Sequence, residues 1–344
     1  MRNKTRKNCL ILNFWCCKNY GALMTCYGVY LLAKEIGLNA KIINYLPNDA
    51  FARYYPNSFS EIFANKHLEL TNLVKSDEEF KKLNRQADIF IAGSDQIWNA
   101  KIVRTHHKYV SDGIYQLDFV HPNKKKISYS ASFGTETFNG DDEEKDKFAQ
   151  RIKNFDAISV REDTGVKILE NDFNTKSTQL IDGAFLIPEQ KLKEITGNTP
   201  TNEKYIGCYA LPYYTDKIWY KEHLKKISKK YNLPIKYLQF DSTTPVEEWL
   251  SFIKNAELLI SDSYHAIVFS IIFSKPFIQL QNSPAQGRFN SLYKLLELDV
   301  KILTEESSDF NCDTIDLNTN WNKTNTIIKN EVQKAKKWLT EAIQ

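Results

Sequence analysis

One pattern recurs along this sequence: a short run of β-type residues, then a polar or glycine-containing break, then often a helical period. Such alternation favours parallel sheets covered by helices, because parallel neighbours need a long crossover between them. In the first half the runs are residues 9–15, 40–46, 87–93, 125–131, 156–160 and 178–184, and in the second half they are 204–211, 235–240 and 256–261. The sequence therefore predicts an α/β protein.

The length of 344 residues exceeds what one hydrophobic core usually accommodates, which predicts two α/β domains. Charge, glycine and proline replace the apolar periodicity near residue 190, so the boundary is expected there. The predicted parts are an N-terminal domain over 1–187 with an irregular insertion at about 49–86, a linker over 188–204, a C-terminal domain over 205–327, and a closing amphipathic helix over 328–344.

Charge and hydropathy narrow the class of partner and the compartment. A net charge of +4 is small for this length and gives no reason to expect nucleic acid. The apolar run Cys9–Cys17 follows a basic start, but Asn13 interrupts it and Lys18 follows it, so it indicates a buried strand rather than a secretory signal. No segment reaches the roughly 18 apolar residues that span a bilayer. We therefore expect a cytoplasmic protein.

Polar residues directly follow several of the predicted strands. In open parallel sheets the ligand lies beyond the carboxyl ends of the strands, so chemistry is expected there. The polar groups are Lys18–Gly21, Gly93–Gln96, Ser130–Gly134, Arg161–Asp163 and Ser261–His265. Each has a structural alternative, since Asp95 or Asp163 could cap a helix and Arg161 with Glu162 could form a solvated pair. Their recurrence after successive strands favours a shared cleft.

The stretch Ser261–Leu280 places one histidine where a polar run gives way to an apolar one. Residues 267–273 are almost wholly apolar, which predicts a buried helix. Ser261, Ser263 and His265 then surround its N-terminus, where unpaired N–H groups and the helix dipole favour an anion such as phosphate. A core histidine is the alternative. No further ligands stand at metal spacing, so no metal is expected.

A series of motifs runs in order through residues 10–300. They are N-Y-G-A, A-D-I-F-I-A-G-S-D-Q-I-W, S-Y-S-A-S-F-G, I-S-V-R-E, W-L-S-F-I-K-N-A-E-L-L-I-S-D-S-Y-H, F-S-K-P-F-I and R-F-N-S-L-Y-K-L-L. Together they resemble the polysaccharide pyruvyl transferase family. The resemblance implies a glycosyltransferase type B-like architecture, with two Rossmann-like domains facing a cleft. It also implies transfer of the enolpyruvyl unit of phosphoenolpyruvate to two hydroxyls of a sugar, giving a pyruvate ketal and phosphate.

The resemblance and the positions after the strands define the expected site. The residues expected at phosphoenolpyruvate are Arg161, Ser261, Ser263, His265 and Arg288, and those expected at the acceptor sugar are Asn19, Tyr20, Ser94, Asp95 and Ser132. Other branches of the family have R-L-H-G where this chain has Ser263–Ala266, and D-P-T where it has Asp182–Ala184. Because an arginine is missing at position 263, Arg288 is expected to replace its charge. The alternative is an exposed arginine on a surface loop.

The expected chemistry assigns roles to these residues. Guanidinium groups balance the carboxylate and phosphate of phosphoenolpyruvate, because they stay charged. His265 is expected to hydrogen-bond or protonate the departing phosphate, and Asp95 to accept the proton of a sugar hydroxyl. No Walker or dinucleotide glycine pattern is present and no step requires a metal, so we expect no cofactor.

Two alternative functions remain at the level of the sequence. A nucleotide-sugar glycosyltransferase of the same architecture would also use a helix N-terminus, for a diphosphate. A non-catalytic sugar- or phosphate-binding relative is suggested by the departures at Ser263 and Gly183. The expected partners are phosphoenolpyruvate and a sugar or lipid-linked oligosaccharide acceptor, through which the protein could contact the inner face of the cell membrane. The sequence makes no prediction of an oligomeric state.

Overall fold

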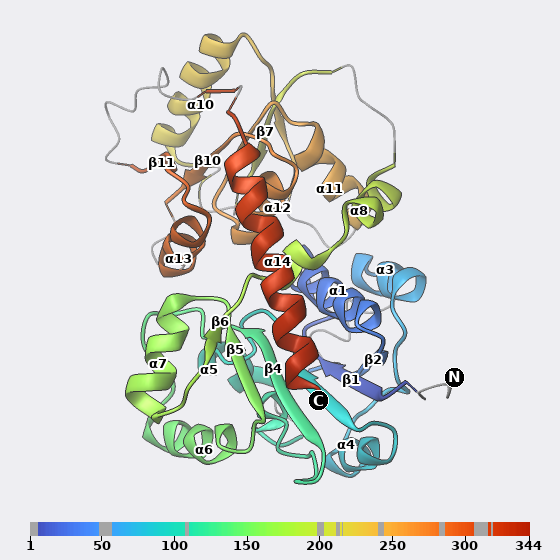
Figure 1. Cartoon of the computed structure of the whole chain (residues 1–344). Coiled ribbons are helices and arrows are strands. Elements are labelled where there is room, and N and C mark those ends of the chain that lie inside the picture. The colour runs from blue at the N-terminus through green and yellow to red at the C-terminus, as the bar shows by residue number, and fades with distance from the viewer. Residues whose placement is uncertain are drawn as a thin grey trace. The chain divides into compact units, whose positions relative to one another are not determined.

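The computed structural model describes residues 6–47, 57–106, 110–197, 203–210, 214, 216–239, 244–281, 286–305, 316–317 and 319–344. The chain divides into two compact units: unit 1 comprises residues 1–187 and 328–344, and unit 2 comprises residues 188–327. Each unit contains one parallel sheet with helices around it (Figure 1). The prediction of an α/β protein with parallel sheets is confirmed.

The sheet of unit 1 has the strand order β2-β1-β3-β4-β5-β6. Its strands are β1 (Asn8–Leu12), β2 (Asn39–Ile42), β3 (Ile89–Ala92), β4 (Lys125–Ala131), β5 (Ala157–Val160) and β6 (Thr178–Gln179). Strand β3 reads IFIA and is buried at every position, as expected for a parallel strand that is covered on both faces. Each strand overlaps a run that the sequence analysis identified.

Helices and short 3-10 turns surround this sheet. They are α1 (Tyr20–Glu35), α3 (Phe59–His67), α4 (Asp77–Lys82), η1 (Leu83–Arg85), α5 (Ala100–Val103), η2 (Arg104–His106), η3 (Ile114–Gln116), α6 (Asp142–Ile152), α7 (Asp163–Phe173), η4 (Gly183–Leu186) and α14 (Asn322–Ala342). An aromatic group that includes Trp98, Phe133 and Phe148 packs in the core beside the carboxyl ends of β3 and β4. This packing supports the loops that follow these strands.

The sheet of unit 2 has the strand order β11-β10-β9-β7-β8. Its strands are β7 (Ile206–Tyr209), β8 (Ile235–Tyr237), β9 (Leu258–Ser261), β10 (Phe277–Leu280) and β11 (Ile302–Leu303). Its helices are α8 (Glu189–Thr196), α10 (Ile218–Tyr231), α11 (Val246–Asn255), α12 (Tyr264–Ile272) and α13 (Gln286–Leu296). The sequence pattern did not indicate β11, because two residues are too short to show a period.

The expected linker, insertion and closing helix can be compared with the helices that the structure has there. Helix α8 occupies part of the expected linker, because Leu192 and Ile195 bury one face of it and Lys254 Nζ donates to Thr196 Oγ1 at 2.9 Å. Helices α3 and α4 lie in the expected insertion, of which residues 49–56 are outside the described part. The closing helix α14 begins at Asn322 rather than at residue 328. None of the described helices has the length and apolar character that a bilayer-spanning segment requires.

Candidate functional site

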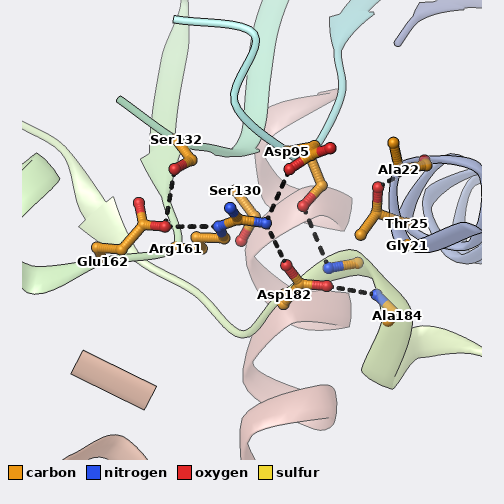
Figure 2. Close-up of polar contacts among 12 residues, drawn as sticks. Gly21, Ala22, Thr25, Asp95, Ser130, Ser132, Arg161, Glu162, Asp182 and Ala184 are labelled. Atoms are coloured by element: carbon orange, nitrogen blue, oxygen red, sulfur yellow. Dashed lines mark hydrogen bonds and ion pairs between the residues drawn. The ribbon is translucent and has the colours of Figure 1, made fainter. Parts of the chain in front are cut away.

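The carboxyl edge of the unit 1 sheet carries a buried group of charges around Arg161. The Arg161 Nε donates to Glu162 Oε1 at 2.6 Å, while Nη1 donates to Asp182 Oδ2 at 2.8 Å and lies 3.3 Å from Asp95 Oδ1. Ser132 Oγ donates to the same Glu162 oxygen at 2.7 Å. Figure 2 shows the guanidinium between carboxylates that come from different segments. We call these five residues the Arg161 cluster.

Burial defines what the Arg161 cluster can do. The side chains of Arg161, Asp95, Glu162 and Asp182 are 0%, 5%, 3% and 1% exposed. Buried charges are tolerated when they are paired and hydrogen-bonded, and here one guanidinium faces three carboxylates. An excess of carboxylates disfavours the binding of a further anion at this cluster. A contact between Arg161 and phosphoenolpyruvate would require these carboxylates to release the guanidinium, and it stays a prediction.

The backbone of this edge is held in an uncommon conformation. Asp95 has φ 79° and Ser130 has φ 48°, in the left-handed region that costs a non-glycine residue about 1–3 kcal/mol. Ser132 N donates to Asp95 O at 2.9 Å and so fixes the loop after β3 against the end of β4. The alternative that Asp95 caps a helix is wrong, because Asn99 caps α5 and the Asp95 carboxylate pairs with Arg161. Strain of this kind is concentrated at functional sites.

The segment after β6 ties the cluster to helix α1. Asp182 Oδ1 accepts from Ala184 N at 2.8 Å, and Ser94 Oγ accepts from Gly183 N at 3.3 Å. A Cβ on Gly183 would lie 2.7 Å from the carbonyl oxygen of Thr25 in α1. Glycine is therefore the residue that this close approach admits. Burial and the Asp182 carboxylate raise the pKa of Tyr129 well above its ordinary value, so its hydroxyl stays a donor.

Two residues predicted at the acceptor sugar begin helix α1. Asn19 Oδ1 accepts from Gly21 N at 2.9 Å and from Ala22 N at 3.3 Å, so this amide caps the helix. The Tyr20 ring is 1% exposed and stacks on Phe59 with the ring centroids 4.1 Å apart. Both side chains thus have structural roles at this edge of the sheet. Their contact with a sugar stays a prediction.

The polar stretch of unit 2 forms the entry into helix α12. Ser263 is the N-cap and its Oγ accepts from Ala266 N at 3.4 Å, while Ser261 Oγ accepts from Ser263 N at 3.1 Å and donates to Tyr209 O. His265 lies in the first turn and is 4% exposed. The helix is buried along most of its length, as the sequence predicted. The helix start therefore presents an ordered polar turn beside a buried imidazole.

Arg288 lies next to this turn. It belongs to helix α13, and its guanidinium carbon is 5.4 Å from the centroid of the Tyr264 ring. Such a cation–π contact orients an arginine and keeps its charge near the ring. The Tyr264 ring also contacts the rings of His265 and Phe289 at 5.1 Å and 5.5 Å between centroids. The alternative of an exposed arginine on a surface loop is wrong, because Arg288 is partly buried in a helix.

The structure thus separates the predicted site residues into two groups. Asn19, Tyr20, Ser94, Asp95, Ser132 and Arg161 lie at the carboxyl edge of the unit 1 sheet, and Ser261, Ser263, His265 and Arg288 lie around the start of α12 in unit 2. The sequence analysis did not assign functional roles to Glu162, Asp182 or Tyr264. Glu162 stands two residues after one β-type run, Asp182 lies within another, and Tyr264 stands inside a family motif, so a signal existed for each.

The family model for polysaccharide pyruvyl transferases matches residues 19–284, which include both groups apart from Arg288. The chain belongs to the polysaccharide pyruvyl transferase family. This assignment confirms the resemblance that the motifs carry, and it supports a transferase that acts in polysaccharide synthesis. The comparison with curated proteins finds no match.

Solved structures that resemble this family member share its fold. UGT89C1 from Arabidopsis thaliana, complexed with quercetin, matches with a TM-score of 0.53 at 9% identity over 99% of this chain and 100% of its own. UDP-GlcNAc 2-epimerase from Methanocaldococcus jannaschii matches with a TM-score of 0.53 at 12% identity, over 94% of this chain and 92% of its own. The wall teichoic acid polymerase TagF matches with a TM-score of 0.50 at 14% identity, over 98% of this chain and 88% of its own. These neighbours support the predicted two-domain, Rossmann-like fold of glycosyltransferase type B.

Proposed function

We propose that this family member is a pyruvyltransferase that uses phosphoenolpyruvate as its donor. It would move the enolpyruvyl unit onto two hydroxyls of one sugar in a polysaccharide or glycan precursor. Two C–O bonds to the sugar form, and the C–O bond between the central pyruvyl carbon and the phosphate breaks. Of the two hydroxyl protons, one goes to the terminal methylene, which becomes a methyl group, and the other leaves with the phosphate. The family match over residues 19–284 carries this proposal.

We assign the donor to unit 2. The N-terminus of α12 offers a helix dipole to the phosphate, and the partly buried Arg288 beside Tyr264 adds a permanent positive charge. His265 in the first turn would hydrogen-bond the departing phosphate or give it a proton. Ser261 and Ser263 would hold the turn in shape, since their hydroxyls already bind its backbone.

We assign the acceptor to the carboxyl edge of unit 1. Asp95 would accept a proton from the attacking hydroxyl, because its carboxylate sits in a strained, fixed loop beside Arg161. The exposed Asn19 would contact the sugar, and the buried Ser94, Ser132 and Tyr20 would support the surface that receives it. Arg161 would act as a positioning residue, because it touches Asp95, Glu162 and Asp182 at once.

The decisive experiment is turnover with defined oligosaccharides. The full chain is incubated with phosphoenolpyruvate and candidate acceptors. Phosphate release is measured, and the mass of the acceptor sugar is determined by mass spectrometry. We expect phosphate release that depends on the acceptor, together with a fixed gain of mass on the sugar. No release with any acceptor, while phosphoenolpyruvate binds, would favour a non-catalytic relative.

A second candidate function is a nucleotide-sugar glycosyltransferase. It is favoured by the fold of the solved neighbours and by the N-terminal turn of α12, which suits a diphosphate as well as a monophosphate. Sugar nucleotides offered in place of phosphoenolpyruvate separate the two functions. Transfer of a sugar from them would replace the pyruvyltransferase proposal.

A further inference from the structure

Two basic segments that are far apart in sequence meet at the amino edge of the unit 1 sheet. Strands β3 and β4 pair in parallel with Ile89 opposite Lys125, so the residues before each strand lie at the same edge. Lys124 Nζ accordingly lies 3.0 Å from Asp88 Oδ1. Lys81, Lys82 and Arg85, which end α4 and η1, precede β3 and line the same hollow as Lys124. We call these four cations the basic surface.

The basic surface is concave and rests on a fixed support. A cavity of about 430 Å³ lies among its four cations, Asn84 and His121. Asn84 lies in the first basic segment and is buried, with 6% of the residue exposed. Its side chain binds the second segment: Nδ2 donates to Phe119 O at 2.9 Å, and Oδ1 accepts from His121 N at 2.8 Å. The amide therefore holds the two basic segments together. In Figure 1, α4 lies at the lower end of this unit.

Among the described residues, ion pairs neutralise only part of the charge of the basic surface. Within the described residues, Lys81, Lys82 and Arg85 form no ion pair, and Lys124 pairs with the single carboxylate of Asp88. A helix dipole favours lysines in the last turn, which explains Lys81 and Lys82 in the six-residue helix α4. It does not explain Arg85 and Lys124, which lie outside this helix.

We propose that the basic surface docks the protein on an anionic phospholipid bilayer, with a headgroup phosphate in the hollow. Clusters of four or more Lys and Arg bind anionic membranes, and each such residue changes the partition coefficient between water and the membrane by about fivefold. Because no described helix spans a bilayer, the attachment would be peripheral. The basic surface lies at the amino ends of the strands and the Arg161 cluster at their carboxyl ends, so docking would leave the cluster's edge of unit 1 uncovered. The inference does not depend on the proposed reaction.

Vesicle sedimentation of the full chain tests the proposal. Vesicles of phosphatidylcholine with phosphatidylglycerol are compared with vesicles of phosphatidylcholine alone, at low and at high sodium chloride. We expect the wild type to sediment with the anionic vesicles only, and less at high salt. The triple variant Lys81→Gln, Lys82→Gln, Arg85→Gln should bind on the order of 100-fold more weakly. All three side chains are exposed, so its circular dichroism should match the wild type.

Two control variants isolate the position and the sign of the charge. Lys225→Gln, Lys226→Gln, Lys229→Gln removes the same charge from exposed positions on α10 and should bind like the wild type. Lys81→Arg, Lys82→Arg, Arg85→Lys keeps the charge and should also bind. Equal binding by the wild type and the first triple variant would overturn the proposal. Binding of a homopolymeric RNA through the same residues, without binding to anionic vesicles, would overturn the membrane as the partner.

Discussion

Replacement of Arg161 distinguishes a positioning role from a direct contact with phosphoenolpyruvate. Two of its guanidinium nitrogens reach three carboxylates at 2.6, 2.8 and 3.3 Å, and none of these side chains is more than 5% exposed. Lysine has one nitrogen and cannot reproduce the separate contacts of Nε and Nη1. Loss of one charged hydrogen bond costs about 1.5–3 kcal/mol, and loss of one partner from a buried charge pair costs about 3–5 kcal/mol.

We therefore expect Arg161→Lys to lower the free energy of unfolding of unit 1 by about 2–3 kcal/mol, and Arg161→Met by about 3–5 kcal/mol. Urea denaturation followed by tryptophan fluorescence and circular dichroism measures both. Arg104→Gln is the matched control: its side chain is 53% exposed in a surface pair with Glu144, which contributes at most about 1 kcal/mol.

The kinetics of Arg161→Lys complete the test. If Arg161 positions Asp95, kcat falls while KM for phosphoenolpyruvate stays near the wild-type value. A variant with wild-type stability and a strongly raised KM would refute the positioning role and support a direct contact with the donor.

Three further predictions concern single positions. His265→Ala should release no phosphate, and because the imidazole is buried in the first turn of α12, circular dichroism checks that the variant is folded; normal turnover would contradict its role. Arg288→Ala should raise KM for phosphoenolpyruvate, and Ser263→Arg added to it should recover part of the loss; a double variant no better than the single one would place the charge elsewhere. Gly28→Ala should destabilise unit 1 by about 1–3 kcal/mol, because its Cβ would lie 1.8 Å from Gly183 O; an unchanged urea midpoint would argue against this packing.

The strands and the edge that carries the polar groups could be predicted because their signals are local. An apolar run such as IFIA in β3 defines a strand that is buried on both faces, whatever its neighbours are. The position of Asp95 after β3 and of Arg161 after β5 then follows from the direction that parallel strands share. The buried helix behind His265 was predictable for the same reason, since its apolar run shows no polar face.

The partners of these residues were decided by the tertiary structure. Arg161 meets Asp182 from a strand end 21 residues later, and Arg288 reaches Tyr264 from a different helix. The left-handed backbone of Asp95 and the meeting of Lys81 with Lys124 likewise depend on strand order and register. A sequence specifies which residues prefer burial and which period they follow, because these preferences act between near neighbours. Which charges face one another is set when the sheet assembles, because pairing across strands depends on contacts between segments that are distant along the chain.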